Sequence, residues 1–113
     1  MKLVILESPY AAANRRTVED NVEYAKRCVR DSLGLGEAPL VSHLLYTQVG
    51  ILDDNNVEQR MLGIQAGHTW YEVAEGCVVY NDYGVSNGMA AGILRANEAG
   101  VPVIYRALFR GVH

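Results

Sequence analysis

Short apolar runs alternate with longer segments of helical spacing along the whole chain, and this alternation limits the fold more than any other feature. The apolar runs are residues 2–6, the first half of 38–48, 76–81 and 101–106. A short continuous apolar run is typical of a strand buried on both faces of a parallel sheet. Strands that alternate with helices form such sheets through right-handed crossovers, with helices on both faces. No linker divides the chain, so the sequence predicts one α/β domain over residues 1–113.

Three segments between these runs have the spacing of helices, and they are residues 17–33, 57–74 and 87–99. Thr17 followed by Asp20 resembles a capping box with Asp in the usual Glu position. Gly63 and Gly67 lie four residues apart inside the second segment. Because glycine destabilises a helix interior by up to about 1 kcal/mol, this pair predicts close packing or a break.

Composition limits the partners of the chain. Of 113 residues, 50% are hydrophobic and 20% are charged, and the formal net charge is -3. The basic residues from Arg15 to Arg30 are interspersed with acidic ones, which indicates a solvated face of mixed charge. A polynucleotide-binding surface needs a clustered basic footprint, so we expect no nucleic acid polymer as partner.

No apolar stretch approaches the roughly 20 residues of a membrane span, and the N-terminal run is too short for a signal peptide and lacks a cleavage site. We therefore expect no membrane partner and a cytoplasmic protein. Cys28 and Cys77 lie far apart and form no C-x-x-C pair. Buried free thiols are the preferred interpretation, with a disulfide or metal site as the alternative.

Ligands of parallel α/β sheets bind beyond the carboxyl ends of the strands, near the point where strand order reverses. This rule selects candidates without reference to any family. The predicted ligand-binding residues are Ser8, Pro9, Tyr10, His43, Asp82, Gly84, Ser86, Asn87, Gly88 and Met89, and the candidate acids or bases are Asp82, Glu7 and His43.

Most of these residues also have a simpler interpretation. Ser86 and Asn87 open a predicted helix, where free N–H groups attract an anion, but either residue could merely cap that helix. The Asp82 carboxylate could accept hydrogen bonds from ribose hydroxyls, or Asp82 could simply form a turn. Tyr10 could stack on a base or lie in a plain surface turn. His43 could act as acid or base near neutral pH, although a lone histidine is more often structural.

Several kinds of site have no support in the sequence. There is no G-x-G-x-x-G fingerprint of a dinucleotide site and no P-loop lysine motif, and we expect no cofactor. No H-x-x-x-H pattern or carboxylate cluster suggests a metal. A nucleophilic Ser or Cys is not indicated, because neither cysteine is at a strand end and the serines lack a recognisable elbow.

Taken together, ILESPY, SHLLYTQ, GIQAGHTWYEVAEGCVVYNDYGVSNGM and AGVPVIYR resemble the nucleoside 2-deoxyribosyltransferase-like family, and most closely its small phage and bacterial members of uncharacterised function. The resemblance covers nearly the whole chain and rests on the order of the motifs. It implies a flavodoxin-like or Rossmann-like three-layer fold with four to five strands. It also implies a homo-oligomer that binds a nucleoside or nucleotide at its strand ends, and the apolar tail 105–109 likewise favours an oligomer.

The resemblance also implies a lost nucleophile. The family's glutamate lies in a pattern like D-S-G-T-x-x-E, which aligns with residues 86–92 and places Gly92 at the glutamate and Ser86 at the aspartate. Glycine cannot form a glycosyl ester, so deoxyribosyl transfer by that route is closed. Asp82 or Glu7 could instead supply an acid for a direct displacement.

Three functions follow as hypotheses. The first is a nucleotide-binding protein without the family's catalysis, which captures or senses a small nucleotide such as a phage-targeted immune signal, in the host cytoplasm if phage-encoded. The second is a hydrolase or transferase acting on nucleosides or nucleotides with Asp82 or Glu7 as substitute acid. The third is a structural or interaction protein with a decayed site.

Overall fold

The computed structural model describes residues 1–109, and its regular elements follow the predicted alternation. The strands are β1 (Lys2–Glu7), β2 (Glu37–Leu40), β3 (Gly76–Tyr80) and β4 (Val103–Arg106). The helices are α1 (Val18–Gly34), α2 (Ser42–Leu45), α3 (Val57–Thr69) and α4 (Asn87–Glu98), and the 3-10 turn η1 (Trp70–Glu72) follows α3. Within the described residues the strands form one parallel sheet in the order β2-β1-β3-β4.

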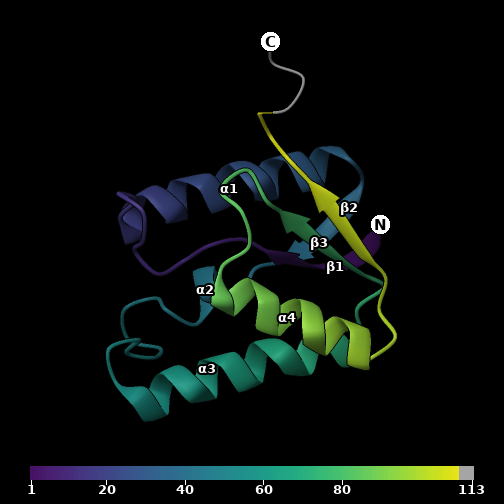
Figure 1. Ribbon diagram of the computed structural model, residues 1–113. Helices are drawn as coiled ribbons and strands as arrows, with labels where there is room; N and C mark the ends of the chain where they lie inside the picture. The colour runs from purple at the N-terminus through teal and green to yellow at the C-terminus, as the bar shows by residue number, and fades with distance from the viewer. Residues whose placement is uncertain (110–113) are drawn as a thin grey trace.

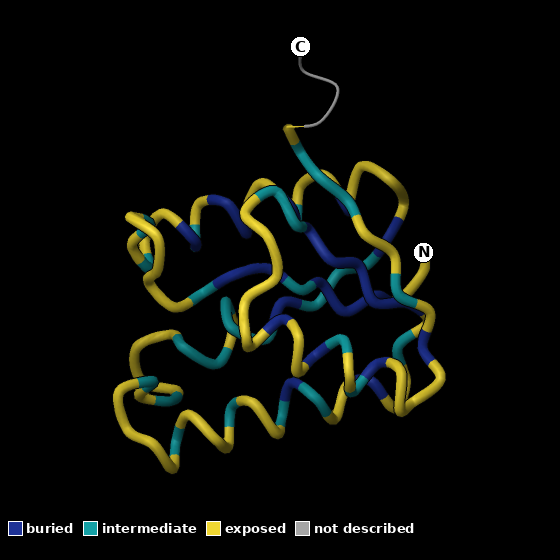
Figure 2. The backbone as a smooth tube through the Cα atoms, viewed as in Figure 1, coloured by how far each residue is buried: buried dark blue, intermediate teal, exposed yellow. Residues whose placement is uncertain are grey.

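Helices cover both faces of this sheet, so the fold has three layers (Figure 1). Helix α1 lies on one face, and α3 and α4 lie on the other. The two central strands supply side chains to both faces by alternation. Val4 and Leu6 of β1 join the cluster on the α1 face, whereas Ile5 joins the cluster on the opposite face. This double burial explains the continuous apolar runs, and Figure 2 shows the buried residues concentrated along the central strands.

Local signals in the sequence account for the start of α1. Thr17 Oγ1 accepts from the Asp20 N–H, and the Asp20 carboxylate accepts from the Thr17 N–H, as the predicted capping box requires. These two bonds satisfy donors that a helix N-terminus leaves unpaired. Cys28 and Cys77 are buried free cysteines, as expected.

Two segments differ from the predicted elements. The second strand ends at Leu40, and the next residues form α2, so Ser42 and His43 lie on a short helix instead of at a strand end. The predicted helix 57–74 ends at Thr69 and continues as η1. Helix α3 approaches α2 closely at Gly67, where a Cβ would lie 2.6 Å from Ser42 Oγ. The close packing expected at this glycine therefore joins α3 to α2.

Within residues 1–109, no helix combines the length and the apolar character that crossing a bilayer requires. In the same part of the chain, no group of three or more His, Cys, Asp or Glu side chains is placed to hold a metal ion.

Candidate functional site

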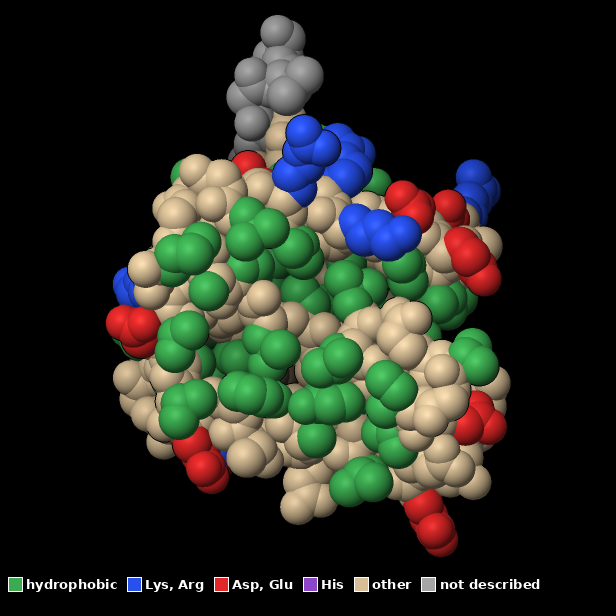
Figure 3. Space-filling view, turned by 180° about the vertical axis from the view of Figure 1, so that it is seen from behind, with side chains coloured by type: hydrophobic (Ala, Val, Ile, Leu, Met, Phe, Trp, Pro, Cys, Tyr) green, Lys and Arg blue, Asp and Glu red, His purple; other side chains and the backbone are tan. Residues whose placement is uncertain are grey.

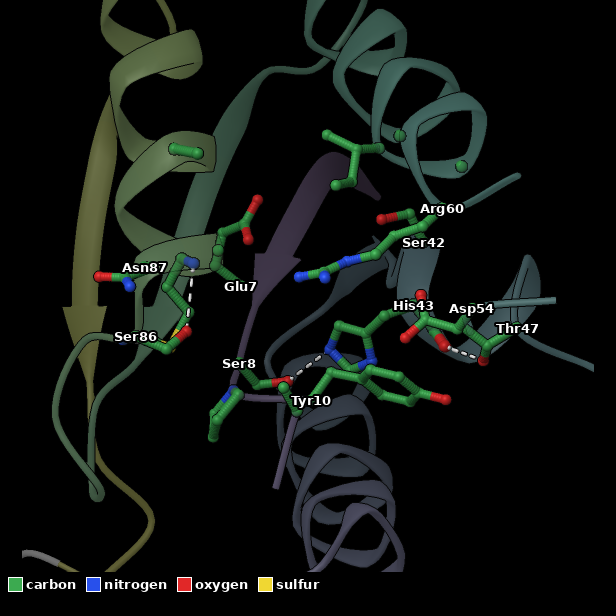
Figure 4. A pocket seen from close by; sticks show the side chains of 18 of the residues that line it. Glu7, Ser8, Tyr10, Ser42, His43, Thr47, Asp54, Arg60, Ser86 and Asn87 are labelled. Carbon is green, nitrogen blue, oxygen red and sulfur yellow. Dashed lines mark hydrogen bonds between the residues drawn. The ribbon is translucent and has the colours of Figure 1, made fainter. Parts of the chain in front are cut away.

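A cavity of about 560 Å³ opens beyond the carboxyl ends of the central strands. From β1 the chain first adds β2 on one side and later β3 on the other, so the boundary between β1 and β3 is where strand order reverses. That is the place where sheets of this kind bind ligands. The walls come from the loop after β1, from α2 and α3, and from the loop between β3 and α4 (Figure 4).

A buried amide fixes the loop that follows β1. Asn21 of α1 is fully buried, and its Nδ2 donates to the carbonyl oxygens of Tyr10 and Ala11, each at 3.0 Å. Its Oδ1 accepts from Arg16 Nε at 3.1 Å. Asn21 thereby holds Tyr10 and Arg16, both of which line the cavity.

His43 lies at the floor of the cavity beside Ser8 and Tyr10. Ser8 Oγ and His43 Nε2 are 3.0 Å apart, and the rings of Tyr10 and His43 have centroids 5.3 Å apart. Burial lowers the pKa of His43 to about 4, so the ring is neutral at physiological pH. His43 Nδ1 is buried and has no hydrogen-bond partner among residues 1–109. A neutral imidazole of such low basicity fits a positioning role better than proton transfer.

Glu7 brings a carboxyl group into the cavity from the end of β1. Its Oε2 accepts a hydrogen bond of 2.6 Å from the Tyr71 hydroxyl. Burial raises the pKa of Glu7 to about 7, and the Tyr71 hydrogen bond opposes part of that rise. A Cβ at Gly92 would lie 2.2 Å from Glu7 Oε2. The Glu7 carboxyl group therefore occupies the space that a side chain at position 92 would need.

The first turn of α4 forms the wall of the cavity that faces α2 and α3 (Figure 4). Ser86 Oγ accepts from the Met89 N–H at 3.2 Å, and the Ser86 N–H points to Met89 Sδ at 3.4 Å. The capping alternative for Ser86 is thus confirmed. Capping satisfies only part of a helix N-terminus. The N–H groups of Asn87 and Gly88 have no hydrogen-bond partner among residues 1–109, and both residues line the cavity.

Asp82 and Gly84 are the two predicted binding residues that do not line the cavity. The Asp82 carboxylate accepts from the Tyr24 hydroxyl and from the N–H groups of Leu108 and Phe109. Its oxygens are engaged in fixing the C-terminal segment, so the predicted roles in ribose binding and catalysis have no geometric support. Gly84 has a φ of 83° in the turn that follows β3, and its N–H donates to the Asn81 carbonyl.

The structure adds cavity residues that the strand-end rule does not select. Arg60 of α3 points its guanidinium into the cavity, between Glu7 and His43 (Figure 4). No side chain or carbonyl of residues 1–109 pairs with this guanidinium. The signal was present in the sequence, because Arg60 shares one helical face with the glycine pair. That face lines the cavity with Arg60, Gly63, Ile64, Gly67 and His68.

Tyr83 and Arg16 form a second addition to the site. The Arg16 guanidinium lies over the Tyr83 ring, 4.3 Å from its centroid, and both residues line the cavity. Tyr83 also packs against Tyr24 in an edge-to-face contact, with centroids 4.8 Å apart. Sequence reasoning missed Arg16 because it lies outside any strand end.

Comparison with solved structures agrees with this architecture. The chain superposes on a 2-deoxyribosyltransferase from the psychrotolerant bacterium Bacillus psychrosaccharolyticus with a TM-score of 0.69. The match covers 93% of this chain and 72% of that one, at 14% sequence identity. At this identity the likeness establishes a shared fold, and it confirms the deoxyribosyltransferase-like α/β architecture that the resemblance implied.

Other comparisons place the chain by its sequence. No curated protein matches it. A family model described as a domain of unknown function, DUF7768, matches residues 2–106. Because this match spans nearly every described residue, the chain belongs to the DUF7768 family.

Proposed function

We propose that this protein binds a nucleoside or nucleotide in the cavity between β1 and β3. The observation that supports this most is the convergence of eight of the ten predicted binding residues on one cavity at the strand-order reversal. They are Ser8, Pro9, Tyr10, His43, Ser86, Asn87, Gly88 and Met89. A volume of about 560 Å³ is within the range of small-molecule pockets.

The cavity offers different chemistry to different parts of such a ligand. Tyr10 presents an aromatic ring on which a base can stack. Arg60 and the N–H groups of Asn87 and Gly88 present donors and positive charge to an anion. A nucleoside phosphate can stack its base on the aromatic ring and place its phosphate against the donors, whereas a neutral sugar has neither a base nor an anionic group. Capture or sensing of a small nucleotide, including an immune signal, is the form of this function that needs no catalysis.

Melting-shift measurements with nucleosides, their 5′-monophosphates and ADP-ribose test the proposal. A ligand at about 100 times its dissociation constant stabilises a protein by about 2.7 kcal/mol, which is readily measured. Arg60→Ala is expected to weaken the monophosphates more than the nucleosides. Arg30→Ala is the matched control, because Arg30 is exposed on α1 and does not line the cavity.

Two results would count against this function. If Arg60→Ala weakens the binding of nucleosides and of monophosphates equally, Arg60 does not bind the anion. A folded protein that shows no shift with any member of the panel would favour the structural hypothesis instead.

A second candidate function is cleavage of an N-glycosidic bond, by a hydrolase or a transferase. One solved structure with the same fold is that of a 2-deoxyribosyltransferase described as a suitable biocatalyst for the industrial synthesis of nucleosides. The observation that favours an enzyme is the carboxyl group of Glu7, which lies in the cavity with a pKa of about 7. Detection of free base after incubation separates this candidate from simple binding.

A further inference from the structure

Glu7 and Gly92 form an unusual pair at the back of the cavity. The ideal Cβ position of residue 92 lies 2.2 Å from Glu7 Oε2, 2.5 Å from Cδ and 2.8 Å from Oε1. These distances are far below van der Waals contact, so the whole carboxyl group fills the volume of the missing side chain. The two residues come from different elements, β1 and α4. An acid therefore stands beside α4, although α4 itself supplies none there.

From this geometry we infer that Glu7 is the general base of a hydrolytic reaction at C1′ of a bound nucleoside or nucleotide, with Tyr71 as its positioning residue. The inference rests on the proposed binding function, because a substrate must occupy the same cavity. To the second candidate function it adds the role of Glu7 as base and the group that orients it.

The surroundings of Glu7 suit a base that works near neutral pH. Proton transfer is most effective when the pKa of the catalytic group lies close to the working pH, and the pKa of Glu7 is about 7. The Tyr71 hydroxyl holds Oε2 at 2.6 Å, and Cys77 Sγ lies 3.2 Å behind that hydroxyl. Oε2 is thus fixed, while Glu7 still forms part of the cavity wall.

The charged and titratable groups near Glu7 come from several elements, and α2 contributes His43 within the same cavity. Helix α3 contributes Arg60 within the cavity and His68, whose ring centroid lies 6.3 Å from that of Tyr71. The turn η1 contributes Tyr71, and β3 contributes Cys77. Helix α4 contributes only the glycine at the point of contact. Burial raises the pKa of Cys77 to about 11 and lowers the pKa of His68, so Glu7 is the acid among them that titrates near pH 7.

The reaction balances with water as the only co-reactant. The ionised Glu7 carboxylate takes a proton from a water molecule as the water oxygen forms a bond to C1′. The bond between C1′ and the base nitrogen breaks, and its electron pair leaves on the base. That nitrogen takes a proton from solvent, and Glu7 later returns its proton to solvent. The products are the free base and the sugar or sugar phosphate.

The test measures binding and base release on the same samples. Nucleosides and nucleoside 5′-monophosphates are incubated with the protein, free base is measured by chromatography, and melting shifts are recorded in parallel. Loss of a general base costs about 100-fold or more in rate. Glu7→Gln is expected to lose base release by this factor and to keep the ligand-induced shift. The exposed Glu98→Gln is the matched control and should keep both.

Tyr71→Phe provides a measurement that a purely structural role would not move. The Tyr71 hydrogen bond lowers the pKa of Glu7, so its removal should move the midpoint of the rate-against-pH curve to higher pH. The wild-type rate itself should rise with pH through about 7, because the base form is the ionised carboxylate. If Glu7→Gln fails to fold, Glu7→Asp should fold, release base more slowly and keep this pH sign.

Each contrary result has a distinct meaning. Ligand-induced shifts without base release from the wild type would overturn the catalytic role and leave the binding function standing. Undiminished release from Glu7→Gln would overturn the role of Glu7. A glycosylated form of the protein, detected by mass spectrometry, would replace attack by water with a covalent route. Absence of both shift and release would overturn binding and catalysis together.

Discussion

Replacement of Glu7 by Gln should make the protein more stable, and the gain should grow with pH. In the folded state burial raises the pKa of Glu7 from an ordinary value of 4.5 to about 7. Folding therefore favours the protonated form, and stability is lost as pH rises from the lower value through the higher one. Gln keeps an amide oxygen that can accept the Tyr71 hydrogen bond, but it never ionises in the cavity.

The magnitude follows from the same two values. Each tenfold change in the protonation equilibrium corresponds to about 1.4 kcal/mol, so the full difference amounts to about 3 kcal/mol. Between about pH 5 and about pH 8, the wild type should lose about 2 to 3 kcal/mol relative to Glu7→Gln. Other groups that titrate in this range, including His43 and His68, are common to both proteins and cancel in the comparison.

Urea unfolding of both proteins at several pH values in this range supplies the free energies of unfolding. The difference between the variants should be small at the acidic end and should level off above pH 7. Parallel curves for the two proteins would refute the reasoning, because they would mean that Glu7 is solvated and ordinary. A direct titration of the Glu7 carboxyl group by NMR with a midpoint near 4.5 would refute it as well.

Two further predictions concern packing and assembly. Gly92→Ala should destabilise the protein by about 1 to 3 kcal/mol, since overpacking must displace the Glu7 carboxyl group, whereas Gly34→Ala, which meets nothing within 4 Å, should be neutral or stabilising in thermal or urea unfolding. We also expect a homo-oligomer, because large hydrophobic side chains including Ile104, Tyr105 and Leu94 stay exposed and hydrophobic side chains gather over the centre of one face (Figure 3). Light scattering that shows a monomer at about 50 micromolar, a concentration chosen for an interface of modest affinity, would contradict that expectation.

The sequence predicted the fold because a strand that is buried on both faces has apolar side chains at every position. All five residues of β3 are buried, and they appear in the sequence as an uninterrupted apolar run. The boundaries of the helices and strands were harder to predict from the sequence. Residues 42–45 are apolar enough to extend β2, but α2 forms there and packs Ser42 against Gly67 of α3. This contact joins residues that are distant in the sequence, so no local sequence pattern predicts it.

The candidate site was predictable only where it follows the strand ends. Ser8, Tyr10 and Ser86 line the cavity as expected because the topology places their loops there. Asp82 follows a strand end but does not line the cavity, because its carboxylate accepts from the N–H groups of Leu108 and Phe109. The contact between Glu7 and Gly92 depends on how β1 and α4 pack in space. The sequence shows that Gly92 lacks a side chain, but only the structure shows which atoms fill the space.

The hydrogen bonds of Asn21 bear on how strongly and how fast a ligand can bind. By donating to the carbonyl oxygens of Tyr10 and Ala11 from inside the fold, this amide restrains the loop after β1 before any ligand arrives. Ordering a residue costs about 1 to 2 kcal/mol of conformational entropy, and a loop already ordered spares the complex that cost. The wall that carries Tyr10 is thus preorganised, so affinity at this wall depends on the contacts themselves and association need not wait for the loop to rearrange.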